Sequence, residues 1–281
     1  MAPFSSTSPS GSVSTLNGTR FGRNRSNSIY GGNSPATATN NSAMLAASTK
    51  KSVTSATAIH QHIYVINWEN VLMPTAWLSA QLRVDASVAS LQNAQRVLAQ
   101  TPQLRTLLAA IEERIIQLIK QASALGQVCI LSEKTVQFVE LTCSIFFPRL
   151  TTSLRNTTPS RIFVVGAADT NYSYQEQVDW KVNILRTVCY ERVFAGQDAV
   201  KAMTEPKTGR FGVVTLCSGD LDVHASDQLK VVAPYVVTKS VKVGGQAAAP
   251  LSLEAFAAQL ETLAKFVREA TAFNGAIRIA L

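Results

Sequence analysis

An alternation of apolar strands and amphipathic helices begins near residue 62 and constrains the fold of this chain more than any other feature. Short runs of β-branched and other apolar residues predict strands at 62–67, 127–132, 161–167, 212–220 and 236–243. Helical segments separate them, and a terminal helix is predicted from about residue 253 to residue 273. Continuous apolar strands that alternate with helices are typical of a parallel sheet with helices on both faces. The sequence therefore predicts a doubly wound α/β fold.

The clearest helix signal starts at Thr101 and Pro102, a cap residue followed by proline at the first helical position. Apolar residues then recur every three or four positions, which predicts one buried helix face. The residues on this face are Leu104, Leu107, Leu108, Ile111, Ile115, Leu118, Ile119 and Ala122. Gly126 is predicted to close this helix, and a second helix over 135–147 is predicted to stop at Pro148.

Residues 1–58 differ from the rest of the chain, because they are rich in Ser, Thr, Asn, Ala and Gly and contain few large apolar residues. Such a segment cannot bury enough apolar surface to offset the conformational entropy lost on ordering. The sequence therefore predicts a disordered basic tail over residues 1–58 and one folded domain over residues 59–281.

The tail carries most of the net charge of +8. Five basic residues precede Glu69, the first acidic residue, so +8 less +5 leaves only +3 for the rest of the chain. Charges this sparse make a weak nucleic-acid footprint, and we do not expect nucleic-acid binding. Ser26 and Ser28 follow Arg23 and Arg25 at a spacing that basophilic kinases favour. The alternatives are a plain solvated tail and a segment that docks a partner when these serines are phosphorylated.

The sequence gives no sign of a membrane span or a secretory signal. No stretch reaches the roughly 18 consecutive apolar residues that a spanning helix needs, and the first residues lack the apolar core of a signal peptide. Each of the four cysteines stands alone in an apolar run and is predicted as a reduced core thiol. His60, His62 and His224 lack the spacing of a zinc site. We therefore expect an intracellular, cytoplasmic protein.

Polar residues follow the predicted strands at the sheet edge where open α/β folds place their ligands. The segments are Asn67-Trp68-Glu69-Asn70 after the first strand, Ser132-Glu133 after the second, Lys181 in the helix after the third, and Ser218-Gly219-Asp220-Leu221-Asp222 after the fourth. Because the carboxyl ends of parallel strands share one edge, these side chains are candidates for a common site.

This ordered set resembles the haloacid dehalogenase-like (HAD-like) hydrolase superfamily. It resembles in particular a eukaryotic branch whose first motif reads Asp-Trp-Asp-Asp-Thr-Leu, followed by Pro-Thr/Ser-x-Trp-Leu. The accessory matches are Pro74-Thr75-Ala76-Trp77-Leu78, Val139-Glu140-Leu141, Trp180-Lys181 and Lys239-Ser240-Val241-Lys242. The resemblance covers about residues 62 to 275 and implies a Rossmann-like sheet with a small cap domain or none.

The resemblance also implies a role for each position. Asn67 stands where the family has its nucleophilic aspartate, and a carboxamide cannot attack phosphorus, so the covalent route is closed. Glu69 stands at the acid/base position, where its longer side chain moves the carboxyl group by about 1.5 Å. Ser132 and Lys181 match the residues that hold the phosphate group. Loss of a nucleophile costs on the order of 10⁴ to 10⁶ in rate elsewhere.

The same resemblance implies a magnesium site that is incomplete here. Asp220 matches an aspartate that helps to hold magnesium, and Asp222 offers a second acid at an unusual spacing. Because Asn67 supplies only a neutral oxygen, we expect a weak Mg²⁺ site at most and no required cofactor. Lys181 could also neutralise Asp220 directly, which would remove the electrostatic need for a metal ion.

The sequence thus predicts a catalytically inactive HAD-like domain, a pseudophosphatase that serves as a binding or scaffold module for an unknown protein or a phosphate-bearing ligand. Two other functions stay open: a weak or altered magnesium-dependent phosphohydrolase that uses Glu69 or a water, and an unrelated Rossmann-like binding domain.

Purely structural roles stay open as well. Ser132 and Asp220 could cap helices, Lys181 could be an ordinary lysine on a helix face, and Trp68 could be a packing residue. Asn70, like Asn67, could simply hydrogen-bond the loop that follows the first strand.

Overall fold

The computed structural model describes residues 61–85, 87–155, 162–167, 173–189, 211–234, 236–244 and 249–281, and these belong to one compact unit of the chain. The predicted tail over residues 1–58, with Ser26 and Ser28, lies outside the described residues, and so does His60.

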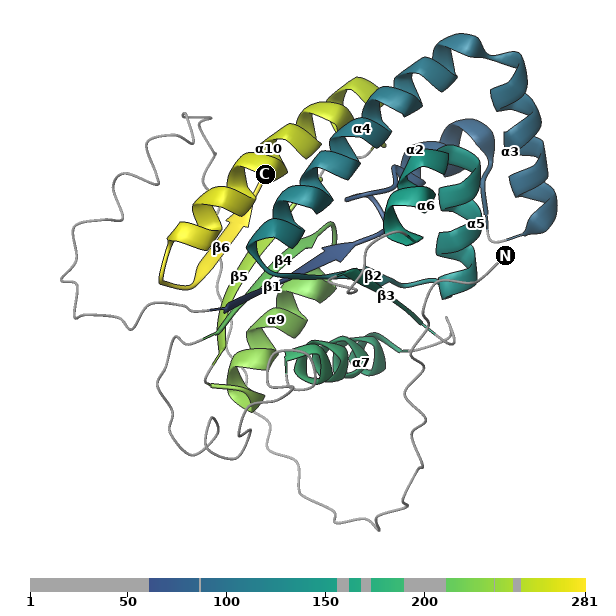
Figure 1. Ribbon diagram of the computed structural model, residues 1–281. Helices are drawn as coiled ribbons and strands as arrows, with labels where there is room; N and C mark the ends of the chain where they lie inside the picture. Colours follow the sequence, from purple (N-terminus) through teal and green to yellow (C-terminus); the bar gives the residue numbers. More distant parts are fainter. Residues whose placement is uncertain are drawn as a thin grey trace, which may run out of the picture. The chain divides into compact units, whose positions relative to one another are not determined.

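The described strands form one parallel sheet in the order β3-β2-β1-β4-β5-β6. Their bounds are β1 Gln61–Asn67, β2 Gln127–Ser132, β3 Ile162–Gly166, β4 Phe211–Cys217, β5 Val236–Lys242 and β6 Ile277–Ala280. The five predicted strands are present, and β6 adds a sixth that the sequence analysis missed. This sheet, with helices on both faces, confirms the doubly wound, Rossmann-like α/β fold (Figure 1).

The bounds of the described helices are α2 Thr75–Leu82, α3 Val88–Gln100, α4 Pro102–Leu125, α5 Val136–Phe146, α6 Pro148–Arg155, α7 Tyr174–Thr187, α9 Asp220–Val232 and α10 Leu253–Ala272. Side-chain caps start four of them, α3, α5, α7 and α10. The Thr135 hydroxyl accepts the Phe138 amide at the start of α5, 3.2 Å away. Pro148 does end the run that contains α5, but it also opens α6, which was not predicted. Proline suits that position because its missing N–H would have no partner in the first helical turn.

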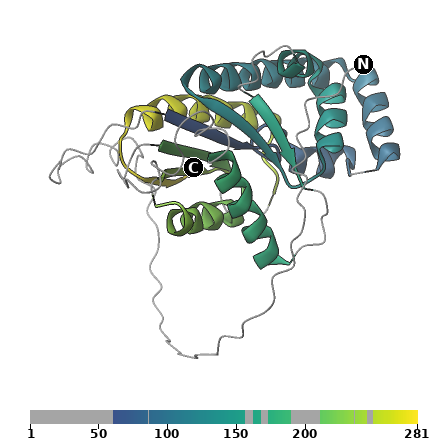
Figure 2. The same cartoon turned by 60° about the horizontal axis from the view of Figure 1, so that its bottom comes forward.

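Two apolar layers hold the helices to the sheet. Alternate residues of β1 point to opposite faces, as the period of a strand requires. Tyr64 and Ile66 face α4 and α10, whereas Ile63 and Val65 face α7 and α9. Figures 1 and 2 show the same division, with α4 and α10 side by side on one face and α7 with α9 on the other.

The last crossover has the opposite hand to the others. The connections from β4 to β5 and from β5 to β6 step in the same direction along the sheet. The first runs through α9 and the second through α10, and these helices pack on opposite faces. Two such steps necessarily differ in hand. The α9 connection has the same hand as the earlier crossovers, so the α10 connection is an exception to the strong preference for one hand.

The strand order places a topological switch point between the carboxyl ends of β1 and β4. From β1 the chain winds towards β2 and β3, and from β4 it winds in the opposite direction towards β5 and β6. Ligands of open α/β sheets bind at this switch point, because the loops leave the two strands in opposite directions. Asn67 ends β1 here, and the segment from Ser218 to Asp222 leaves β4 at the same edge.

Candidate functional site

Asn67 and Asp222 meet at the switch point between β1 and β4. The Asn67 side chain is 3% exposed, and its Nδ2 donates to Oδ2 of Asp222 over 2.8 Å. Asp222 lies in the first turn of α9 and is equally buried. Oδ1 of Asn67 is also buried, and within the described part of the chain it has no hydrogen-bond partner. A buried acceptor of this kind is costly unless something else donates to it.

Lys181 lies on α7 and brings its charge into the same place. Helix α7 starts with a capping box formed by Ser173 and Glu176, and it buries one face against the sheet. Lys181 is on that face and is only 1% exposed, so it is not an ordinary surface lysine. Its Nζ donates to Oδ1 of Asp222 over 2.5 Å and to Oε1 of Glu133 over 2.7 Å. The ammonium group therefore bridges two carboxylates.

Glu69 is held against the loop that follows β2. The Ser132 hydroxyl donates to Oε1 of Glu69 over 2.6 Å, and the Glu133 amide donates to Oε2 over 3.2 Å. The Ser132 hydroxyl also accepts the Lys134 amide. Thr135, rather than Ser132, caps α5. Glu69 and Ser132 thus form a second pair, which Glu133 connects to the Lys181 network.

Glycine allows this loop to come so close to the sheet. A Cβ atom at Gly166, the last residue of β3, would lie 2.6 Å from both the Lys134 oxygen and the Val136 nitrogen. The Ala167 amide donates to the carbonyls of Ser132 and Lys134 just beyond it. The absence of a side chain at Gly166 therefore helps to position Ser132 and Glu133. Gly166 lies on β3, two strands away from β1 and Asn67.

Asp220 and Asn70 stand apart from this cluster. The side chain of Asp220 is 82% exposed and accepts from Lys242 over 2.6 Å on the surface. The predicted neutralisation of Asp220 by Lys181 is wrong, because Lys181 neutralises Asp222 instead. Asn70 adopts a left-handed backbone conformation, and its Oδ1 accepts from the Ala76 amide at the start of α2. Asn70 therefore has the structural role that the sequence left open.

The charges in the cluster shift the protonation of its members. Burial raises the pKa of Glu69 above its ordinary value, although the Ser132 hydrogen bond acts in the opposite direction. Burial likewise raises the pKa of Asp222, and the neighbouring Lys181 ammonium opposes that shift. Burial alone would lower the pKa of Lys181, but Asp222 and Glu133 outweigh it, so this pKa is raised. Lys181 is therefore charged at neutral pH.

Glu133 has a role at this site that the sequence did not predict. It touches both halves of the cluster, through its amide to Glu69 and through its carboxylate to Lys181. Its side chain is 49% exposed, so it is also the part of the cluster most open to solvent. In the sequence, the only indication of this role was that Glu133 directly follows the second predicted strand, beside Ser132.

The residues present do not fit a bound magnesium ion. Mg²⁺ requires oxygen ligands at about 2.0–2.1 Å in octahedral geometry. Both oxygens of Asp222 already accept from nitrogen, one from Lys181 and one from Asn67. Among the described residues, no three His, Cys, Asp or Glu side chains gather closely enough to hold a metal ion. The ammonium of Lys181, which contacts Asp222 directly, would also repel a metal cation bound to the same carboxylate.

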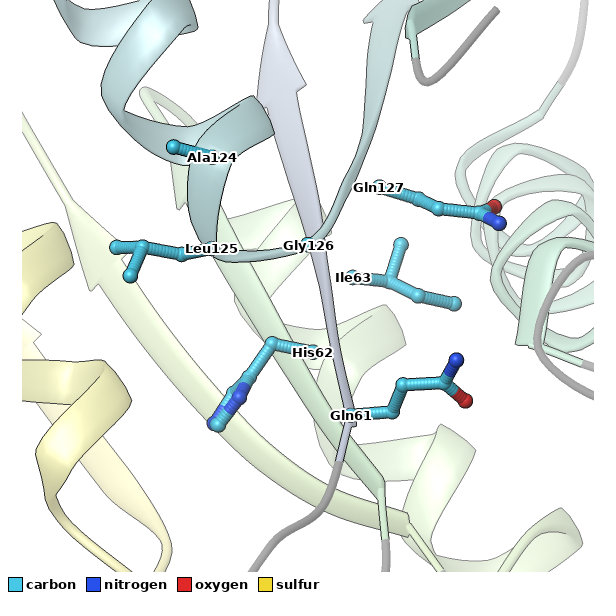
Figure 3. Close-up of a pocket in the computed structure, with 7 residues that line it drawn as sticks. All are labelled: Gln61, His62, Ile63, Ala124, Leu125, Gly126 and Gln127. Atoms are coloured by element: carbon cyan, nitrogen blue, oxygen red, sulfur yellow. The ribbon is translucent and has the colours of Figure 1, made fainter. Parts of the chain in front are cut away.

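A cavity of about 250 Å³ lies at the other end of the sheet (Figure 3). It is lined by residues where β1 begins and where α4 turns into β2, namely Gln61, His62, Ile63, Ala124, Leu125, Gly126 and Gln127. In Figure 3 the side chains of Gln61 and Gln127 extend to one side of the strands and those of His62 and Leu125 to the other. None of the predicted site residues lines this cavity.

Further predictions concern the cysteines, Trp68 and membrane-spanning segments. All four cysteines are buried, as predicted for core thiols. Trp68 is fully buried, in line with a packing role. No helix within the described ranges has the length and apolar character needed to span a membrane. Comparisons of the chain with models of protein families, with curated proteins and with solved structures found no match.

Proposed function

We propose that this domain is a catalytically inactive HAD-like domain that acts by binding rather than by turnover. The observation that carries the proposal is the contact between Asn67 and Asp222. The position that would need a nucleophilic carboxylate holds a neutral amide, and the Nδ2 of that amide donates a hydrogen bond to the carboxylate of Asp222. A carboxamide in this state offers no nucleophile.

The state of Glu69 supports the same proposal. A general acid or base must reach the proton that it transfers. Both oxygens of Glu69 accept hydrogen bonds from the loop after β2, from Ser132 and from Glu133. A hydrolase that used Glu69 would first have to release these two bonds.

Between the two kinds of partner, a phosphate-bearing ligand is less favoured than a protein. The two groups expected to hold phosphate, the Ser132 hydroxyl and the Lys181 ammonium, already donate to carboxylates of the protein. Phosphate would have to displace Glu69 or Glu133 and would then lie near Asp222. An anion close to these carboxylates is disfavoured by charge repulsion, so the geometry favours a scaffold or protein-binding role.

The experiment is magnesium-dependent hydrolysis of p-nitrophenyl phosphate by the 281-residue chain and by an Asn67→Asp/Glu69→Asp double variant, after both are shown to fold. We expect no turnover above background from the natural chain and at least ~10²-fold more from the double variant, since a nucleophile is worth more than that. Adding Lys181→Ala to the double variant should abolish the gain.

Two results would contradict the proposal. Turnover by the natural chain that Lys181→Ala abolishes would show that Glu69 or a water performs the reaction. A folded double variant without activity would argue against descent from a hydrolase and in favour of an unrelated Rossmann-like binding domain.

A further inference from the structure

A fully buried lysine fastens the end of helix α10 to the sheet. Lys239 lies on β5 and is 0% exposed. Its Nζ donates to the carbonyl oxygen of Ala270 and, over 2.5 Å, to that of Phe273, where α10 ends. The same Nζ lies 3.2 Å from Nε2 of His62 on β1. No carboxylate of the described residues contacts this ammonium group, so two carbonyl oxygens and one ring nitrogen hold its charge.

These contacts determine the protonation state of His62. An ammonium group has three N–H donors and no acceptor, so Nε2 of His62 must accept from it. The ring is therefore neutral and carries its proton on Nδ1. Burial lowers the pKa of Lys239 to about 8, so its ammonium form prevails at neutral and acidic pH. Burial and, to a smaller degree, this ammonium lower the pKa of His62 from 6.5 to about 4.

A second contact ties the last turn of α10 to β1. The Tyr64 hydroxyl lies 2.6 Å from Oγ1 of Thr271, and the Tyr64 ring stacks on that of His62. Burial raises the pKa of Tyr64, so this residue stays uncharged in acid. Tyr64 therefore adds a contact that acid does not change.

Other charged groups around Lys239 are exposed or paired elsewhere. Strand β4, which lies between β1 and β5, turns only apolar side chains to this face. On β6, Arg278 pairs with Asp227 of α9, which packs on the opposite face. The charged residues in the last two turns of α4 and α10 are exposed, namely Lys120, Lys265, Arg268 and Glu269. His62 is therefore the residue at which a proton changes the balance of charge beside Lys239.

We infer that Lys239 and His62 form an acid-sensitive latch that holds the last turn of α10 and strand β6 on the sheet, and that protonation of His62 opens it. A protonated ring could not accept from Lys239 and would place two buried cations 3.2 Å apart. Both groups reach water when residues 268–281 leave the sheet. Strand β5 then becomes the edge of the sheet. The inference does not depend on the proposed function, since it concerns the opposite end of the strands.

The first experiment measures amide hydrogen exchange in the natural 281-residue chain at pH 7 and pH 5. Each rate is divided by that of the unfolded peptide at the same pH, which gives an opening constant. For residues 268–281 this constant should rise about 20-fold from pH 7 to pH 5, because the pKa of His62 is 6.5 in the open state and about 4 in the closed state. It should also stay at least ~10-fold above that of β2, since the segment opens locally. No rise, or exchange together with β2, would overturn the inference.

The variant His62→Gln tests the role of the proton. A glutamine oxygen can accept from Lys239 but does not titrate. At pH 7 the opening constant of residues 268–281 should stay within about threefold of the natural value, and its rise at pH 5 should also be less than about threefold. His224→Gln is the matched control, because His224 is an exposed histidine on α9, and it should keep the full rise. A full rise in His62→Gln would overturn the inference.

The variant Lys239→Met tests the role of the ammonium group. The carbonyls of Ala270 and Phe273 lose their donor, so the opening constant at pH 7 should rise at least ~10-fold. An unchanged constant would overturn the latch. His62 also lines the cavity of Figure 3. If its protonated ring turned into that cavity instead, residues 268–281 would stay closed in acid, and the natural chain would show no rise. If Lys239→Met does not fold, the natural chain and His62→Gln decide.

Discussion

The side-chain nitrogen of Asn67 donates to Oδ2 of Asp222 over 2.8 Å, and this hydrogen bond joins two buried residues that are 155 positions apart in the sequence. It connects the end of β1 with the first turn of α9. An amide is the right partner here because it donates to the carboxylate, whereas an aspartate at the same position would oppose it with a second negative charge.

Asn67→Asp should therefore destabilise the folded chain. Two carboxylates at hydrogen-bond distance cannot both ionise without cost, and Lys181 neutralises only one of them. We expect the free energy of unfolding at pH 7 in EDTA to fall by about 2 kcal/mol. The loss should be smaller at pH 5, where the two acids share a proton. Urea unfolding at both pH values measures this, and Asn93→Asp on the exposed side of α3 is the control. An equal loss at both pH values would contradict the explanation.

Asp222→Asn should cost far more stability than Asp220→Asn, although the two aspartates are two positions apart. Asp222 is buried and pairs with Lys181, and removing one partner of a buried ion pair costs about 3 kcal/mol or more. Asp220 makes an exposed pair with Lys242 and should change the free energy of unfolding by no more than about 0.5 kcal/mol. Chemical denaturation of both variants tests this. Similar losses would mean that the Lys181 network contributes little.

Gly126→Ala should be strongly destabilising for steric reasons. A Cβ atom at Gly126 would lie 2.1 Å from the carbonyl oxygen of His62, which belongs to the backbone of β1 and cannot rotate away. We expect a loss of about 3 kcal/mol, at the upper end of overpacking costs. At Gly275 the nearest atoms belong to the half-exposed ring of Phe273, which can move. Gly275→Ala should therefore cost less than about 1 kcal/mol, and thermal unfolding can compare the two.

Acid should weaken the fold through His62. Burial lowers its pKa from 6.5 to about 4, and the ammonium of Lys239, which lies 3.2 Å from its Nε2, adds to this effect. Between pH 6.5 and pH 4 the unfolded chain binds more protons at this residue than the folded chain, so stability falls as the pH is lowered through that range.

The variant His62→Phe isolates this contribution. It keeps a ring beside Tyr64 but cannot bind a proton. The difference in free energy of unfolding between pH 6.5 and pH 4.5 should be smaller for His62→Phe than for the natural chain. Lys239 keeps its bonds to the carbonyls of Ala270 and Phe273 at the end of α10, so the variant should still fold. An identical pH dependence would show that other groups dominate.

The sequence predicted the sheet because parallel strands that are buried on both faces leave long apolar runs. It did not predict β6, whose four residues Ile277–Ala280 form a short edge strand with alternating burial. It also treated Pro148 only as a stop, although proline is over-represented at the first position of a helix. Both errors concern short elements, a strand of four residues and a helix of eight.

The sequence predicted which strand ends contribute to the site, but it did not predict the directions in which the side chains point. Asp220 and Asp222 both follow β4, and the sequence could not show which one faces inward. That choice depends on where α9 begins, because residues two apart on a helix point in different directions. Lys181 was placed correctly on a helix, but its burial follows from the packing of α7 on the sheet. The place of Glu133 directly after β2 was visible in the sequence, but its role follows only from its contacts with Glu69 and Lys181.

The packing of α10 against α4 affects how the chain folds while the ribosome is still making it. A ribosome adds about 5–20 residues per second, and domains begin to fold from the amino-terminal side. Helix α4 and strand β1 are made long before α10, so the apolar surface that α10 covers waits on the order of ten seconds for its partner. Had the last crossover followed the usual hand, α10 would have packed beside α9, its neighbour in the chain. During that interval the apolar face that α4 turns to α10 has no partner helix from the same chain.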